Sequence, residues 1–137
     1  MEKFDEWNIV KKKTQKTKRV LTLRQREVWW AKLGQNIGSE EYGKNSNFTR
    51  PVVVIKRLTR DLVLIVPTTT KIKEDNDYFH TVSFFEKIKQ QNIKVSVMLL
   101  QLRVISIKRV LNKIGIINKE EFKTIQEKLV KIVGPTL

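Results

Sequence analysis

The sequence predicts a small β-rich (β+α) domain, in which a curled antiparallel sheet carries a helix near each end of the chain. Two observations lead to this prediction. The middle of the chain contains short runs of β-branched and aromatic residues, which are typical of strands. Both ends instead place apolar residues at helical spacing. The chain has 137 residues, which is enough for one domain with one small core.

The first 25 residues are expected to form a short helix followed by a basic arm. Phe4, Trp7 and Val10 recur at a spacing of three, which suits one face of a helix. The segment 11–19 then holds six basic residues in nine. Such a run is either a solvated arm or an arm that grips phosphate groups, and the pattern alone leaves both interpretations open.

The central part of the chain supplies the predicted strands. Pro51 opens one apolar run and Pro67 ends another, at positions where a hydrogen-bond donor can be missing from the ladder. Because these runs are short and apolar throughout, they favour barrel or sandwich strands that are buried on both faces. Trp29 is expected in the core, and Trp30 in the core or at an interface rather than stacked on a base. The predicted strand segments are 27–33, 51–55, 61–67, 78–85 and 95–107.

A second helix is predicted at the C-terminus. Asn118 can cap it, and Glu121 three residues later resembles the second half of a capping box. Gly134 and Pro135 form a stop signal. The helix is expected to pack against the sheet through one apolar face, made by Phe122, Ile125, Leu129, Ile132 and Val133.

The charge balance predicts a polyanionic partner. Lysine and arginine number 28 against 14 acidic residues, which gives a formal net charge of +14. Nucleic acid fits this excess better than an anionic membrane or an acidic protein. The absence of cysteine excludes a disulfide scaffold, a thiol nucleophile and a cysteine-based zinc site. The start of the chain does not resemble a signal peptide, and no apolar stretch is long enough for a bilayer, so we expect a cytoplasmic protein without a membrane partner.

Conventional hydrolase chemistry is not indicated. His80 is the only histidine, it is expected to be structural, and no residue near it in the sequence resembles a second base. No group of residues has metal-ligand spacing. The five glycines are scattered singly, so there is no phosphate-binding loop. We therefore expect neither a metal nor a cofactor.

Two segments do have the chemistry to hold a phosphodiester. A glycine-bounded polar loop leads to Arg50, directly before an apolar strand, and another apolar strand ends in Thr68, Thr69 and Thr70. A guanidinium presents a planar fork of donors that matches phosphate oxygens, and a hydroxyl adds one more hydrogen bond. The alternative is structural: the arginine closes a loop and the threonines fit a strand edge.

Four short motifs follow one another along the chain: VWWAKL at 28–33, GSE at 38–40, RPVVV at 50–54 and VPTT at 66–69. Their order resembles the MazF/PemK toxins of type II toxin–antitoxin systems. The resemblance covers about residues 26–134 and includes a downstream strand at 97–105. The sequence departs from the family pattern at Arg26, where a glycine is usual, in a longer loop between Gly43 and Arg50, and in the N-terminal extension.

The resemblance implies a small SH3-like β-barrel of the MazF/PemK/CcdB type over residues 26–137, forming a homodimer. It implies metal-independent cleavage of single-stranded RNA and an acidic antitoxin as partner. The catalytic residues would be Arg50, Thr69 and Glu40, where Glu40 either accepts a proton from the 2′-hydroxyl or orders its loop. The RNA contacts would come from Ser39, Arg50, Thr70 and Gln101. Two alternatives stay open: a non-catalytic nucleic-acid-binding barrel, and a toxin of the same fold that acts on DNA gyrase through its C-terminal helix.

Overall fold

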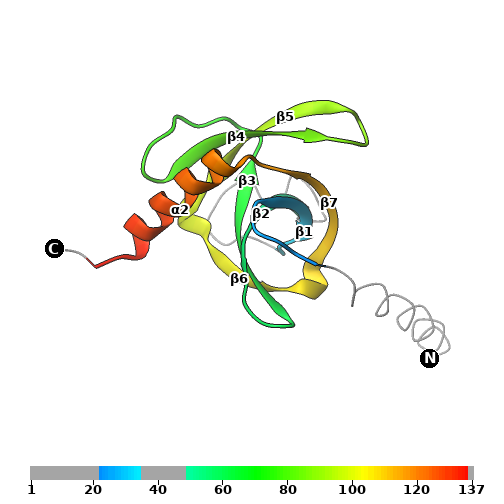
Figure 1. Cartoon of the computed structure of the whole chain (residues 1–137), viewed down its shortest axis with the longest axis horizontal. Coiled ribbons are helices and arrows are strands. Elements are labelled where there is room, and N and C mark those ends of the chain that lie inside the picture. Colours follow the sequence, from blue (N-terminus) through cyan, green and yellow to red (C-terminus); the bar gives the residue numbers. More distant parts are fainter. Residues whose placement is uncertain (1–21, 35–48, 136–137) are drawn as a thin grey trace.

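The computed structural model describes residues 22–34 and 49–135, which form a curved sheet with one long helix packed against it (Figure 1). The helix is α2 (Lys119–Val133), and two short 3-10 turns are η1 (Leu99–Gln101) and η2 (Ile107–Arg109). The strands are β1 (Glu27–Lys32), β2 (Thr49–Arg57), β3 (Leu62–Thr69), β4 (Phe79–Glu86), β5 (Gln91–Met98), β6 (Arg103–Ser106) and β7 (Val110–Ile116).

All strand pairs are antiparallel, and the sheet curls until its two end strands meet. The order is β4-β5-β3-β2-β1-β7, with β6 beside β3. Gly115 of β7 lies against Phe84 of β4, so close that a Cβ atom there would stand 2.5 Å from the Phe84 ring. The strands therefore curve around a common centre as an open barrel (Figure 1).

The two prolines occupy places where the sheet tolerates them. Pro51 pairs with β1, but the pairing of β2 with β3 begins only at Val52. The sequence predicted that Pro67 ends its strand. This is wrong, because β3 continues to Thr69. On one side β3 changes its partner from β6 to β5 between Ile65 and Thr68. Both prolines thus have a strand neighbour on one side only, where a missing N–H costs least.

The sheet is buried on both faces, as its apolar strands predicted. Along β1, Val28 points into the core cluster that includes helix α2, whereas Trp29 and Ala31 point into a second cluster on the other face. Trp29 is in the core, and Trp30 packs against the helix-side cluster while partly buried. Both tryptophan predictions are consistent with this packing.

Helix α2 follows the predicted pattern with two corrections. The Asn118 side chain accepts a hydrogen bond from the Glu121 amide at 2.8 Å, so the N-cap forms. The Glu121 carboxylate does not complete a capping box, because it binds His80 instead. Phe122, Ile125 and Leu129 are buried and Ile132 is partly buried, but Val133 is 66% exposed and does not belong to the packing face.

The strands in the second half of the chain differ from the predicted ones. The stretch 95–107 is not one strand, since η1 divides it into β5 and β6. Strand β7 was not predicted at all. The predicted N-terminal helix and the basic arm at 11–19 lie outside the described residues, which begin at residue 22. Within the described part of the chain, no helix has the length and apolar character needed to cross a membrane.

Candidate active site

Arg50 is held against the end of strand β3. Its Nη1 donates a hydrogen bond to the main-chain oxygen of Thr68 at 3.1 Å, across the β2–β3 boundary. The Thr68 side chain is fully buried, and its hydroxyl donates to the main-chain oxygen of Pro51 at 2.8 Å. These two bonds cross between the same two strands. Because Thr68 directly precedes Thr69, they hold the half-exposed Arg50 side chain close to Thr69.

The hydroxyl of Thr69 is oriented by the chain that follows it. Its Oγ1 accepts a hydrogen bond from the main-chain N–H of Lys71 at 3.2 Å. Because a hydroxyl has one donor and two acceptor positions, this bond leaves the hydroxyl proton available to donate outward. Thr69 is half-buried while Thr68 is buried, as expected for neighbours on opposite faces of a strand.

The other predicted contact residues are spread around this point. Thr70 is exposed and lies just beyond the end of β3. Gln101 is exposed in η1, between two strands that both pair with β3, and its amide approaches the sulfur of Met98 at 3.9 Å. Ser39 and Glu40 lie outside the described residues. The structure thus brings Arg50 to the residue before Thr69, and the predicted roles of all these residues in catalysis or binding stay predictions.

Sequence reasoning missed Ser96. It lies in β5 opposite Thr69, is fully buried, and accepts a hydrogen bond from the Lys73 main-chain N–H at 2.8 Å. A serine between Val95 and Val97 in an apolar strand is the signal that could have revealed it, because a buried hydroxyl requires a partner.

His80 does have acidic neighbours, which the sequence could not show. Its Nε2 lies 2.5 Å from the Glu121 carboxylate of α2, and its Nδ1 lies 3.5 Å from Asp75. The Lys128 ammonium is 3.4 Å from the same Nδ1. Burial tends to raise the pKa of Asp75, but hydrogen bonds from Thr81 and the charges of His80 and Lys128 outweigh it and lower that pKa. This cluster ties the helix to β4.

Glu27 is a second buried carboxylate, and it holds β1 to β7. It accepts hydrogen bonds from the Arg24 amide and the Trp29 indole, both at 3.0 Å, and pairs with the Lys113 ammonium at 3.1 Å. Burial alone would raise its pKa, but these bonds outweigh that effect and lower the pKa of Glu27. Among the described residues, no three acidic, histidine or cysteine side chains form a metal-binding group.

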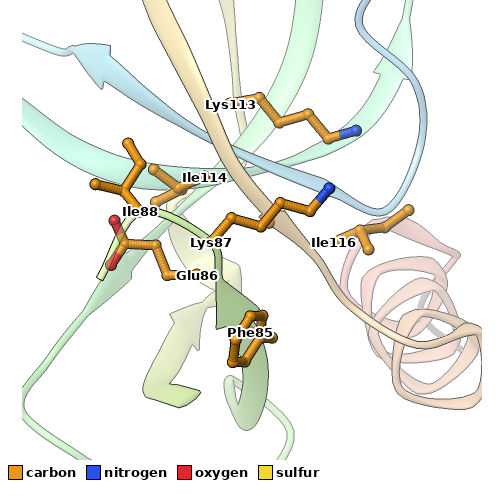
Figure 2. A pocket seen from close by; sticks show the side chains of 8 residues that line it. Phe85, Glu86, Lys87, Ile88, Lys113, Ile114 and Ile116 are labelled. Atoms are coloured by element: carbon orange, nitrogen blue, oxygen red, sulfur yellow. The ribbon is translucent and has the colours of Figure 1, made fainter. Parts of the chain in front are cut away.

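A pocket of about 320 Å³ lies elsewhere, where the end of β4 and the turn after it face β7 (Figure 2). Figure 2 shows the ammonium ends of Lys87 and Lys113 extending toward the same side of it, away from the side chains of Ile88 and Ile114. Neither Arg50 nor Thr69 lines this pocket. It is therefore separate from the candidate active site.

The comparison of the sequence with known protein families identifies the family of this fold. The profile of the family described as "PemK-like, MazF-like toxin of type II toxin-antitoxin system" matches residues 24–133. The chain belongs to this family. A search of curated proteins gave no significant match.

Solved structures show the same fold. One is described as an endoribonuclease in complex with its cognate antitoxin from a mycobacterial species, with 12% identity and a TM-score of 0.60, over 82% of this chain and 96% of that one. Another is the MazE–MazF complex from Deinococcus radiodurans, with 14% identity and a TM-score of 0.54, over 85% of this chain and 100% of that one. At such identity the likeness concerns the fold.

Proposed function

We propose that this chain is an endoribonuclease toxin that cleaves single-stranded RNA without a metal, at a site containing Arg50 and Thr69. The observation that carries the proposal is the hydrogen bond from Arg50 to the Thr68 main-chain oxygen. It holds a cation beside a threonine hydroxyl whose proton can donate outward. The family, and the solved endoribonuclease with the same fold, support the same activity.

RNA carries its own nucleophile, the 2′-hydroxyl, so the protein has only to align it and stabilise the charge that develops on the phosphate. Within the described part of the chain, Arg50 uses one of its five N–H donors on Thr68. The others are proposed to bind phosphate oxygens as charge accumulates in the transition state. A guanidinium stays charged near neutral pH, so its main role is electrostatic rather than proton transfer. The products would be a 2′,3′-cyclic phosphate and a 5′-hydroxyl end.

Thr69 would donate its hydroxyl proton to a phosphate oxygen or position the 2′-hydroxyl. Glu40 would take the proton from that hydroxyl or order its loop. Ser39, Thr70 and Gln101 would contact the RNA. These roles come from the family resemblance. The exposure of Thr70 and Gln101 fits a surface contact.

The experiment that tests this proposal is incubation of the purified chain with a long RNA in excess EDTA, followed by mapping of the new ends. Discrete cuts with 5′-hydroxyl ends are expected. RNA that is bound but uncut would favour the non-catalytic nucleic-acid-binding barrel. Cleavage that EDTA abolishes would contradict the metal-free mechanism. Uncut RNA, together with inhibition of DNA supercoiling in a separate gyrase assay, would favour a gyrase poison.

The proposal includes two protein partners, a second copy of the chain and an antitoxin. The dimer rests on the family resemblance. Both solved structures are described as complexes, one with a cognate antitoxin and one as MazE–MazF. A net charge of +14 suits an inhibitor with an acidic segment that folds as it binds. Expression of the chain alone should arrest bacterial growth, and co-expression of such an inhibitor should relieve it. The Arg50→Ala variant should be harmless.

A further inference from the structure

Ser96 stands at the centre of a small network of hydrogen bonds that holds residue 73, four residues beyond Thr69. The side chain is fully buried in β5, in the position that pairs with Thr69 across the sheet. Its Oγ accepts the Lys73 main-chain N–H at 2.8 Å and lies 3.3 Å from the Thr81 hydroxyl of β4. The Thr81 hydroxyl in turn lies 3.5 Å from the Lys73 main-chain oxygen.

One arrangement of protons satisfies all three contacts. The Lys73 N–H donates to Ser96, the Ser96 hydroxyl donates to Thr81, and the Thr81 hydroxyl donates to the Lys73 oxygen. Both main-chain groups of Lys73 are thus bound by one pair of side chains. The two contacts of Ser96 are partly buried, where linked hydrogen bonds strengthen one another. Residue 73 is therefore fixed to the sheet although its own side chain is exposed.

Fixing residue 73 also fixes the turn that orients the Thr69 hydroxyl. Lys71, whose N–H donates to the Thr69 Oγ1 at 3.2 Å, is the second residue after Thr69, and Lys73 is the fourth. Without the bond to Ser96, the segment 70–73 would lose the anchor that holds the Lys71 amide in place. The Thr69 hydroxyl would then be free to rotate and to donate its proton to an acceptor other than the substrate.

We propose that Ser96 is a positioning residue for RNA cleavage, which acts by holding residues 71–73 so that the Lys71 amide aims the Thr69 hydroxyl at the substrate. This inference rests on the proposed function. Thr81 is the second member of the same device. Neither residue touches the substrate.

The test compares RNA cleavage by wild type, Ser96→Ala, Thr69→Val and the double variant, each checked for folding by circular dichroism. Ser96→Ala should lower kcat about 10- to 100-fold with little change in KM, the scale of a small misplacement of a reacting group. In the Thr69→Val background, Ser96→Ala should change kcat by less than about 2-fold, because its target is already gone. Equal losses in both backgrounds would mean a general structural role and would overturn the inference.

Matched variants sharpen the comparison. Thr81→Ser keeps the hydroxyl and should retain kcat, whereas Thr81→Val should lower it. Ser83→Ala removes an exposed hydroxyl from the same strand and should have no effect. Amide hydrogen exchange at Lys71 and Lys73 should quicken in Ser96→Ala, and unchanged exchange would overturn the inference.

The outcomes separate the two proposals. A wild-type chain that cuts RNA, together with a Ser96→Ala variant that is equally fast, would overturn only the role of Ser96. A folded wild-type chain that cuts no RNA would overturn the proposed function and this inference with it.

Discussion

Arg50 reaches from the start of β2 to the end of β3 and binds the main-chain oxygen of Thr68, 3.1 Å away. The bond uses a donor of the guanidinium, not its whole fork, and its acceptor is part of the backbone. Among the described residues, the partner that anchors the side chain is therefore not a carboxylate, which would neutralise its charge. A cation held in this way is ready for a phosphate, which is the property the proposed chemistry requires.

Arg50→Ala should lower the rate of RNA cleavage about 100-fold or more, the loss typical of one donor to a developing anion. The fold should survive, because the change removes a half-exposed side chain and no core volume. Arg60→Ala, in the exposed turn before β3, removes the same charge and serves as the control. Initial rates on one RNA measure both, and equal rates for the two variants would refute a special role for Arg50.

Thr69→Val should also lower the cleavage rate severely, since valine keeps the shape and strand preference but lacks the hydroxyl. Thr70→Val should matter less to the chemical step, because Thr70 lies beyond the strand and is exposed. Single-turnover cleavage compares the two. Full activity in Thr69→Val with loss in Thr70→Val would show that the functional threonine is the next one along.

RNA binding should weaken steeply with salt. If about four phosphates are contacted, the log–log slope for a single strand should be about −3. Fluorescence anisotropy with the inactive Arg50→Ala variant measures it without cleavage. A slope near zero would argue against a nucleic-acid partner. Deletion of residues 1–19 should flatten the slope if the basic segment 11–19 grips phosphates, and leave it unchanged if that segment is only solvated.

The buried Glu27 predicts a loss of stability in acid. Its pKa is lowered in the folded chain, so its contribution is present above the ordinary glutamate pKa of about 4.3 and disappears as pH falls through the lower folded value. At neutral pH, Glu27→Gln should be less stable by about 1–3 kcal/mol, since it loses charged hydrogen bonds. Urea unfolding at a series of pH values should show the two proteins converging in acid. A constant difference at every pH would contradict this assignment.

The strands and the C-terminal helix could be predicted because their apolar patterns are local. Strand β7 could not, since its buried residues Val110 and Ile114 are separated by three exposed residues with no alternating pattern, and only pairing with β1 makes it a strand. The same holds for Glu121. Its sequence position suggests a capping box, but a histidine 41 residues away takes the carboxylate.

Arg26 shows how a departure from a family pattern is accommodated. The resemblance leads one to expect a glycine there, and the residue adopts a φ of +81°, which favours glycine. The arginine in this conformation is held by contacts with Ile117, which follows β7, the strand that pairs with β1. Its Nε donates to the Ile117 oxygen at 3.0 Å, and its own main-chain oxygen accepts from the Ile117 amide at 3.0 Å. The resemblance marks position 26 as a departure from the family pattern, but its positive φ and the contacts around it became visible only in the fold.

The two main residues of the candidate site could be selected from the sequence, but the contacts that hold them in place could not. Arg50 and Thr69 stand out because a charged group and hydroxyls sit at the ends of apolar strands. The anchor at Thr68 and the serine at position 96 depend on which strands become neighbours. Sequence spacing does not contain that information.

The most direct test of the central claim uses the mapped cleavage sequence as two short oligonucleotides, one all-RNA and one with a single 2′-deoxy sugar at the cut position. Both should bind the chain equally, because the phosphates are unchanged. The all-RNA strand should be cut in EDTA, and the 2′-deoxy strand should remain intact, since its nucleophile is missing. Cleavage of the 2′-deoxy strand at a comparable rate would contradict attack by the 2′-hydroxyl and the mechanism built on Arg50 and Thr69.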